Sequence, residues 1–120
     1  MKKIVFLIYA LGLSFTVLAQ QYEPVNPAKD KLDYQGYTIR LMPSREGSYG
    51  YSILKGKAVV AHQLHNPFSM APVGLRRKED VYKVAKWQIE QVQTGKSGTD
   101  IFAKPLPTSV AQTLQIKSQQ

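Results

Sequence analysis

The sequence predicts an α+β domain: a three-stranded antiparallel sheet, one main helix packed on one face of that sheet, and a C-terminal arm. Two observations predict this fold. Residues 37–63 contain three strand-like segments separated by turn residues, and residues 78–92 repeat apolar side chains at helical spacing. Three strands and one amphipathic helix suffice to close a small core, so we expect a single domain from 120 residues.

Residues 1–19 have the composition of a secretory signal peptide. Two lysines precede an apolar run over residues 4–18, and Ala19 then suits signal-peptidase cleavage before Gln20. An uncleaved membrane anchor is the alternative, but the run is short for a span of about 20 residues, and polar glutamines follow it at once. We therefore expect a protein that is secreted across the inner membrane, is periplasmic or extracellular, and keeps no stable membrane span after cleavage.

The rest of the chain divides into three predicted parts. Residues 20–35 carry prolines and alternating charges without an apolar period, which predicts an exposed tether. Residues 36–116 form the predicted domain, and residues 117–120 a frayed tail. Signal removal takes two of the 16 basic residues, leaving 14 against 8 acidic ones, and this net charge of +6 favours anionic partners. The chain has no cysteine, which excludes disulfides and a lipid-anchored lipoprotein.

The predicted sheet depends on alternation and on one turn. Residues 37–42 alternate so that Ile39 and Leu41 share one face, as in a half-buried strand. Residues 49–63 predict a hairpin with Lys55 and Gly56 as its central turn residues. The resulting opposed pairs, all on the core face, are Ile53 with Ala58, Tyr51 with Val60, and Tyr49 with His62. A slip of one residue would reverse the two faces.

The predicted helix begins near Lys78 with Arg77 at its N-cap, and Gly95 suits the position just after its C-terminus. Its apolar stripe should cover one face of the sheet. The residues expected to meet there are Val81, Val84, Ile89 and Val92 from the helix, and Ile39, Leu41, Tyr51, Ile53 and Val60 from the sheet.

The other face should then expose Met42, Leu54, Val59 and Ala61, unless the C-terminal arm or a partner covers it. Within that arm, Thr108 or Ser109 could cap a short helix through Leu114.

Several short motifs resemble a family of secreted bacterial domains, the domain of unknown function 4907. The residues that carry the resemblance are Gly50-Tyr51, Gly56-Lys57, His62-Gln63, Pro67, Gly74, Lys78-Glu79-Asp80 and Lys83-Val84-Ala85. The resemblance covers residues 37–108 and implies the fold and export, but no chemistry. Leu75 stands where the family usually has Phe, and Arg76-Arg77 replaces a hydroxyl-bearing helix cap. The second difference puts in doubt whether the helix start has the same role here as in the family.

Two groups of residues are candidate sites. Arg76, Arg77 and Lys78 precede a helix, where free N–H groups and the helix dipole favour an anion; the alternative is a solvated basic corner. His62, Gln63, His65 and Asn66 form a possible binding loop. The two histidines could be read as metal ligands, but zinc needs three or four converging ligands, so we predict no metal site.

Other chemistries have weaker support. Four tyrosines (Tyr34, Tyr37, Tyr49 and Tyr51) could be read as a stacking platform, but Tyr37 and Tyr51 fall on the predicted core face and the other two make a thin platform, so core packing is favoured. No nucleophile motif or phosphate-binding loop is present, so we predict no catalytic residue and no cofactor.

The leading hypothesis is an exported, non-enzymatic binding or accessory module of the bacterial cell envelope. It would act through the uncovered sheet face or the loop of residues 64–74. Its partner would be an envelope or extracellular protein or an anionic ligand, with no specific nucleic acid. The alternatives are an anion- or polyanion-binding domain that uses the basic helix start, and a metal-dependent enzyme at His62 and His65.

Overall fold

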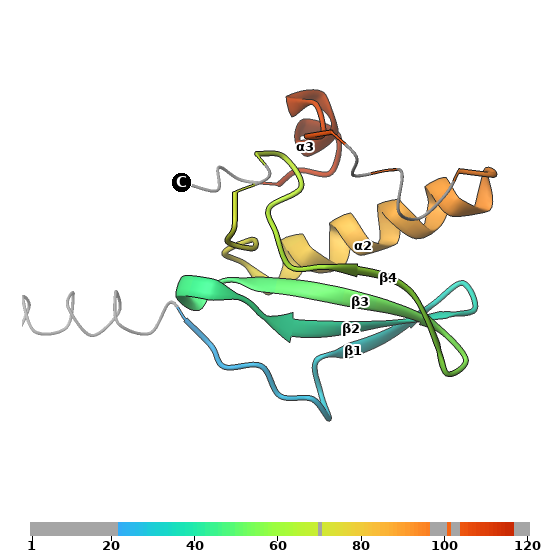
Figure 1. Ribbon diagram of the computed structural model, residues 1–120, viewed down its shortest axis with the longest axis horizontal. Helices are drawn as coiled ribbons and strands as arrows, with labels where there is room; N and C mark the ends of the chain where they lie inside the picture. Colours follow the sequence, from blue (N-terminus) through green and yellow to red (C-terminus); the bar gives the residue numbers. More distant parts are fainter. Residues whose placement is uncertain (1–21, 70, 97–100, 102–103, 117–120) are drawn as a thin grey trace, which may run out of the picture.

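The computed structural model of the protein describes residues 22–69, 71–96, 101 and 104–116. The predicted signal peptide and the predicted tail lie outside the described residues. The chain has an α+β fold in which an antiparallel sheet, a long helix and a short helix lie in successive layers (Figure 1). In chain order the elements are β1 (Lys31–Tyr34), β2 (Tyr37–Pro43), the 3-10 turn η1 (Arg45–Gly47), β3 (Tyr49–Lys55), β4 (Ala58–Gln63), α2 (Lys78–Gln93) and α3 (Thr108–Thr113).

The sheet has four strands in the order β1-β2-β3-β4, rather than the three predicted. The additional strand is β1, which comes from the segment expected to be an exposed tether. It pairs with β2 because Gln35 and Gly36 both take a positive φ, +51° and +87°, and so make the tight turn that suits a hairpin. Three of the four β1 residues are nevertheless exposed.

The register of the β3–β4 hairpin differs from the prediction. Lys55 lies opposite Ala58, so the central turn residues are Gly56 and Lys57, with φ of +62° at Gly56. A glycine in the first central position is typical of a type II′ turn. A β-bulge between Ile53 and Leu54 then shifts the pairing once more.

The bulge, which changes the pairing by one residue, exchanges the predicted positions of two β4 residues. Ala61 pairs with Ile53 and lies in the core at 9% exposure, although it was expected on the open side. Val60 was expected in the core and is 39% exposed. His62 lies opposite Ser52, on the side of the sheet away from the core, and not beside Tyr49. The prediction for these residues was wrong because it did not include the bulge: the turn shift alone moves the pairing by two residues and leaves each β4 residue on its predicted face.

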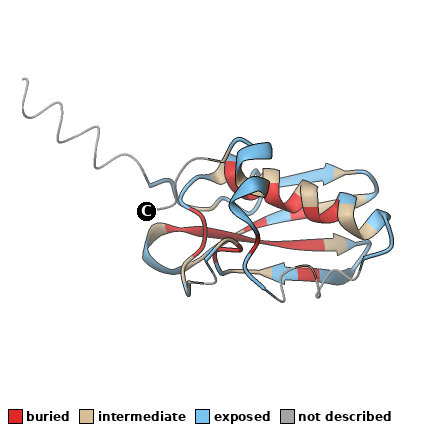
Figure 2. Cartoon of the chain, turned by 90° about the horizontal axis from the view of Figure 1, so that it is seen from above, coloured by how far each residue is buried: buried red, intermediate tan, exposed pale blue. Residues whose placement is uncertain are grey.

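The core lies between α2 and one face of the sheet. Most of the predicted contacts are confirmed: three helix positions and four strand positions are at most 2% exposed, namely Val81, Val84, Ile89, Ile39, Leu41, Tyr51 and Ile53. Figure 2 shows α2 lying across the sheet, with buried residues concentrated on α2 and β3. Val92, in the last turn of α2, is only partly buried. The four tyrosines all belong to this core or pack against it, including Tyr34, which comes from the segment predicted to be an exposed tether.

The ends of α2 match the prediction. Arg77 is the N-cap and makes no side-chain capping hydrogen bond. At the other end, Gly95 has a φ of +95°, its N–H donates to the Val92 carbonyl at 3.0 Å, and the Lys96 N–H donates to the Gln91 carbonyl at 3.3 Å. Such bonds satisfy carbonyl groups that the end of a helix leaves without intrahelical donors.

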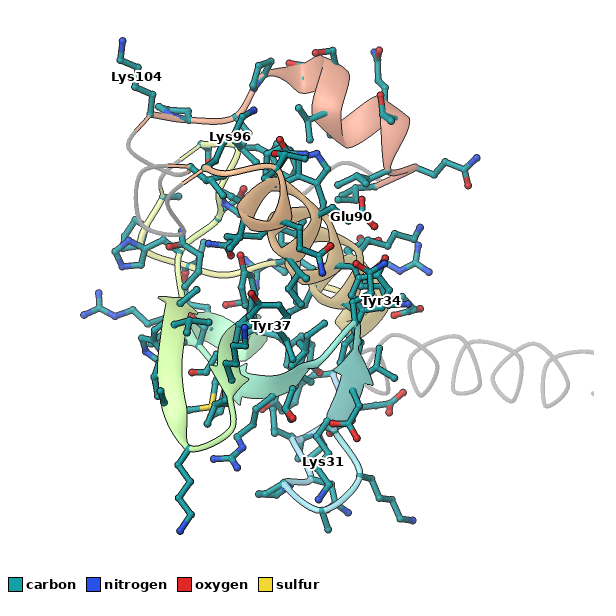
Figure 3. The ribbon with its side chains drawn as sticks, turned by 90° about the vertical axis from the view of Figure 1, so that its right-hand side faces the viewer. Lys31, Tyr34, Tyr37, Glu90, Lys96 and Lys104 are labelled. Carbon is teal, nitrogen blue, oxygen red and sulfur yellow. The ribbon has the colours of Figure 1, made fainter. Side chains whose placement is uncertain are left out.

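The C-terminal arm packs on the side of α2 away from the sheet. The Leu106 N–H donates to the Pro67 carbonyl at 2.8 Å, and Lys83 Nζ donates to the Gln115 carbonyl at 3.1 Å. Figures 1 and 3 both show α3 above α2 and the sheet below it. The described part of the arm therefore leaves the far face of the sheet uncovered. Among the described residues, none of the helices has the length and apolar character needed to cross a membrane.

Candidate functional site

The face of the sheet opposite α2, which we term the open face, carries a line of polar residues across all four strands. Lys31 on β1 pairs with Arg40 on β2, Arg40 pairs with Ser52 on β3, and Ser52 pairs with His62 on β4. Directly opposed residues of antiparallel strands point to the same side of the sheet. We refer to these four residues as the transverse row.

A hydrogen bond joins the last two residues of the transverse row, at its β4 end. Ser52 Oγ lies 2.6 Å from His62 Nδ1, and Ser52 itself is only 7% exposed. Lys31, Arg40 and His62 are exposed. With neighbouring strands about 4.8 Å apart, four strands spread the row over roughly 15 Å. The row therefore presents two fixed positive charges and an imidazole held by a hydroxyl group.

The surroundings of the row are mostly apolar. On one side lie Asp33, Thr38, Leu54 and Val59, which are opposed across the strands; the Asp33 carboxylate accepts from Thr38 Oγ1 at 3.0 Å, and Val59 is 61% exposed. On the other side lie Met42 and Gly50. Only glycine fits at position 50, because a Cβ there would come within 2.4 Å of the Gln63 carbonyl oxygen and 2.7 Å of Leu64 Cα. Leu64 thus rests on the open face next to the row.

A hollow of about 630 Å³ adjoins the open face beyond Leu64. It is lined by Pro43, Ser44, Arg45, Leu64, His65 and Pro72. Ser44 Oγ donates to the Leu64 carbonyl at 2.8 Å, which ties the end of β2 to the loop after β4. Because a second arginine and a second histidine stand at this hollow, the basic character of the open face extends beyond the row.

The structure assigns different positions to the four residues of the predicted binding loop. Two of them organise the loop itself: Gln63 Nε2 donates to the His65 carbonyl at 3.1 Å, and Asn66 Oδ1 accepts from the Phe68 N–H at 2.9 Å. Asn66 is buried, and its N–H also donates to the Val73 carbonyl at 2.6 Å. His62 joins the transverse row and His65 the hollow. The described residues hold no group of three or more His, Asp or Glu side chains that could bind a metal ion.

The Ser52–His62 pair also has a limited chemistry. No carboxylate among the described residues hydrogen-bonds either side chain, so the pair lacks the orienting acid of a nucleophilic triad. The hydroxyl group donates if Nδ1 is unprotonated and accepts if Nδ1 carries the proton. In either state His62 is held in one orientation, with its other ring nitrogen available to a ligand on the open face.

The predicted anion site at the helix start carries internal counter-charges. Arg77 Nη2 lies 2.9 Å from Glu79 Oε1, and Arg76 Nη1 donates to the Glu46 carbonyl at 2.5 Å. Lys78 Nζ lies 3.0 Å from Asp30 Oδ2. These three basic residues, with Glu23, Tyr49 and Glu79, line a hollow of about 160 Å³.

The titration of these groups reflects the same pairing. The pKa of Lys78 is raised overall. Burial is the largest single influence and lowers this pKa, but the hydrogen bond and charge of Asp30, together with the smaller effect of Glu23, outweigh it. The hydrogen bond to Glu79 raises the pKa of Arg77. Cations already matched by neighbouring carboxylates attract an external anion less than cations without such neighbours do.

The segment before β1 lies over this helix start. The Tyr49 hydroxyl group accepts from the Glu23 N–H at 2.9 Å and donates to the Glu23 carbonyl, and the Tyr22 ring stacks on Tyr49 at 5.7 Å between centroids. Lys78 Nζ donates to the Pro24 carbonyl at 3.0 Å. The first described residues are therefore attached to the helix side of the domain.

Sequence reasoning missed Arg40 and Ser52 as site residues. Each follows or precedes a core residue of the same strand, so the alternation that predicted Ile39 and Tyr51 in the core also places these neighbours on the other face. Their alignment with His62 requires the register of two hairpins. That register could not be read from the residues alone.

Comparison of the chain with protein-family models, curated proteins and solved structures finds no match. The class of the protein is therefore set by its architecture, a small α+β domain with one sheet face open. The resemblance to the domain of unknown function 4907 stays a prediction.

Proposed function

We propose that the protein is an exported, non-enzymatic binding module that holds an anionic partner on the open face of its sheet. The observation that carries the proposal is the transverse row, in which Arg40, Ser52 and His62 stand side by side on a face that the described helices do not cover. An arginine fork suits phosphate, sulfate or carboxylate groups, and the hydroxyl and imidazole groups add directional hydrogen bonds.

The apolar flanks define the kind of surface the partner would meet. Leu54 and Val59 lie on one side of the row, with Met42 and Leu64 on the other. An anionic group on a partly apolar carrier would contact both the row and its flanks. The open face has no tyrosine, tryptophan or phenylalanine among the residues that form it, so stacking of nucleic-acid bases is disfavoured.

The anion-binding alternative at the helix start is less favoured by charge. Asp30, Glu23 and Glu79 stand against Lys78 and Arg77 there, whereas no described carboxylate forms an ion pair with Arg40 or Lys31. Carboxylates therefore offset the charge of Arg76, Arg77 and Lys78, and other residues supply the surplus positive charge of the chain. The site best placed to use that surplus is the open face.

The proposal is tested by binding of the purified protein to immobilised dextran sulfate and to inorganic polyphosphate. We expect the affinity to fall steeply between about 50 and 200 mM salt, because charged contacts displace counter-ions. Arg40→Gln and His62→Gln should each weaken binding, Arg40→Gln by about tenfold, which corresponds to roughly 1.4 kcal/mol. Lys104→Gln, on the C-terminal arm, removes one exposed charge far from the row and serves as the matched control.

Three results would count against the proposal. Equal weakening by Lys104→Gln would indicate attraction to net charge alone, and weakening by Arg77→Gln but not by Arg40→Gln would move the site to the helix start. Absence of binding to both polyanions at low salt would remove an anionic partner altogether. The export part of the proposal has its own readout: cell fractionation should place the protein, shortened by its first 19 residues, outside the inner membrane.

A further inference from the structure

The outer edge of β1 has free backbone groups in a regular geometry. The Leu41 N–H donates to the Asp30 carbonyl at 3.0 Å, and β1 pairs with β2 without a register shift. In an antiparallel pair the inward hydrogen bonds fall on alternate residues, so Leu32 and Tyr34 point their N–H and C=O groups toward β2. The corresponding groups of Lys31 and Asp33 point away from the sheet, and no described group hydrogen-bonds them. Figure 1 shows β1 at the sheet edge.

A groove of about 500 Å³ runs between this edge and α2. Its apolar floor includes Leu32, which is 36% exposed, and the half-buried ring of Tyr82. Burial raises the pKa of the Tyr82 phenol, so that this group stays neutral and available as a hydrogen-bond donor. Figure 3 shows Tyr34 and Glu90 at this side of the molecule, where the Tyr34 hydroxyl group donates to Glu90 Oε2 at 2.5 Å.

The rim of the groove is basic. Lysines from both sides line it, Lys29 and Lys31 before and within β1 and Lys83 and Lys86 on α2. Two carboxylates also line the groove, but Asp30 is engaged by Lys78 and Glu79 by Arg77. Lys86 Nζ lies over the Tyr34 ring at 5.4 Å from its centroid, beside the groove. Lys83 Nζ lies 4.0 Å from Asp80 Oδ1 and donates to the Gln115 carbonyl, so the surplus positive charge at the groove comes from Lys29, Lys31 and Lys86. The groove therefore combines an apolar floor with that surplus charge.

The opposite edge of the sheet offers a poorer template for pairing. β4 carries a bulge in its pairing with β3, and its exposed side chains Val59 and Val60 bring no charge that would select a partner. Bulges disturb the regular ladder and protect sheet edges from further pairing. The regular edge of β1 lacks that protection.

We propose that the β1 edge takes up an extended segment of a partner protein as a fifth strand, and that the alternate residues of this segment that face the groove include both apolar and acidic ones. Strand addition supplies backbone hydrogen bonds to Lys31 and Asp33, and the partner's alternate side chains then project over the groove. Apolar side chains there would meet Leu32 and Tyr82, and acidic ones the lysine rim. Lys31 belongs to both the transverse row and the groove rim, but Arg40, Ser52 and His62 do not line the groove, so either proposal can fail alone.

The test compares two variants of one residue. Asp33→Pro removes an N–H that points outward and so blocks strand addition while leaving the β1–β2 hydrogen bonds in place, since Pro is tolerated at such edge positions. Asp33→Ala removes the same carboxylate and keeps the N–H. The probe, called the Glu–Val peptide, is a capped peptide in which every second residue is Val and Glu in turn, with Thr at the positions between, so that one face of the strand carries both. It is compared with a Lys–Val peptide that has Lys in place of each Glu. Binding is followed by amide chemical shifts of the isotope-labelled protein.

We expect the Glu–Val peptide to shift the amides of residues 31–34 and 79–86, with Asp33→Ala binding normally and Asp33→Pro at least about tenfold more weakly. Arg40→Gln, on the open face, should change this binding little. Equal binding by Asp33→Pro and Asp33→Ala, shifts confined to the open face, or no binding would overturn the proposal. If Asp33→Pro does not fold, a Glu–Val peptide N-methylated at alternate amides replaces it; retained affinity in both methylation frames would contradict strand pairing.

Discussion

The two faces of the sheet are built from alternate residues of the same strands, yet they have opposite properties. Facing α2, Ile39 and Ile53 are at most 2% exposed and belong to one continuous core. Facing away from α2, Arg40 and Leu54 occupy the neighbouring positions and remain exposed or partly exposed. Packing against the helix fixes the chemistry of the first face. It leaves the second face free to carry charge.

Removing a polar group should also affect different properties on the two faces, stability on the buried face and binding on the open face. Tyr51 is 1% exposed, and its hydroxyl group donates to Gln88 Oε1 at 2.5 Å within the core. Ser52, the next residue, makes its hydrogen bond to His62 on the open face. A buried polar group that loses its partner is costly because water cannot replace it. We therefore expect mutations on the helix side to change stability, and mutations on the open face to change binding.

The largest expected difference comes from truncating adjacent apolar residues of β3. Ile53→Ala should lower the free energy of unfolding by about 3 kcal/mol, because it removes buried methyl and methylene groups and leaves a cavity. Leu54→Ala, on the open face, should cost about 1 kcal/mol or less, because Leu54 is only partly buried. Urea unfolding monitored by circular dichroism measures both. Equal losses would mean that the open face is covered in solution.

The next comparison concerns the two hydroxyl groups. Tyr51→Phe should cost about 1–2 kcal/mol because it removes a buried donor to Gln88, whereas Ser52→Ala should stay within about 0.5 kcal/mol. Burial raises the pKa of Tyr51 well above its ordinary value, so the group stays protonated in the folded state after it ionises in the unfolded chain. Its stabilising contribution is complete below about pH 10 and is lost as the pH rises further.

The difference in stability between the wild type and Tyr51→Phe should therefore shrink above about pH 10. Thermal unfolding of both proteins from neutral to alkaline pH gives this difference directly. A gap that is constant across the alkaline range would show that the Tyr51 hydroxyl group is reached by water. Ser52→Ala provides the control for general alkaline destabilisation.

The sequence allowed the helix-side face to be predicted better than the open face. Helical spacing placed Val81, Val84 and Ile89 in the core, and strand alternation placed Ile39 and Leu41 there, because burial imposes a period on the residues. The β3–β4 hairpin was the weak step. Reading Gly56 as the second central residue shifted the pairing by two residues, and the missed bulge, which has no periodic signal in the sequence, left Val60 on the predicted core side.

The candidate site was harder to predict for the same reason. Arg40, Ser52 and His62 lie far apart in the sequence and meet only through the registers of two hairpins. β1 was missed because Gln35-Gly36 was not recognised as a tight turn, although Leu32 and Tyr34 alternate with charged residues before it. The basic helix start was visible in the sequence, but its counter-charge Asp30 comes from a segment 48 positions away.

The smallest expected effect compares one carboxylate from each side of the sheet. Asp30 Oδ2 accepts from the Asn26 N–H at 2.7 Å and lies 3.0 Å from Lys78 Nζ on the helix side. Asp33 Oδ1 only accepts from Thr38 Oγ1, at 3.0 Å, on the open face. Asp30→Asn should cost about 0.5–1 kcal/mol near neutral pH, and Asp33→Asn less, because solvent screens both sites.

The pH dependence of the Asp30→Asn effect tests the ion pair with Lys78. The hydrogen bond from Asn26, with the help of Lys78, lowers the pKa of Asp30 below its ordinary value, so its contribution is present above about pH 4 and is lost as the pH falls further. The stability difference between the wild type and Asp30→Asn should therefore disappear in acid, and added salt should reduce it at neutral pH. If this difference persisted in acid, the Lys78 ion pair would not be what attaches the segment before β1 to the helix side. Paired charges would then not distinguish the helix side from the open face, and the two sides would differ only in their core contacts.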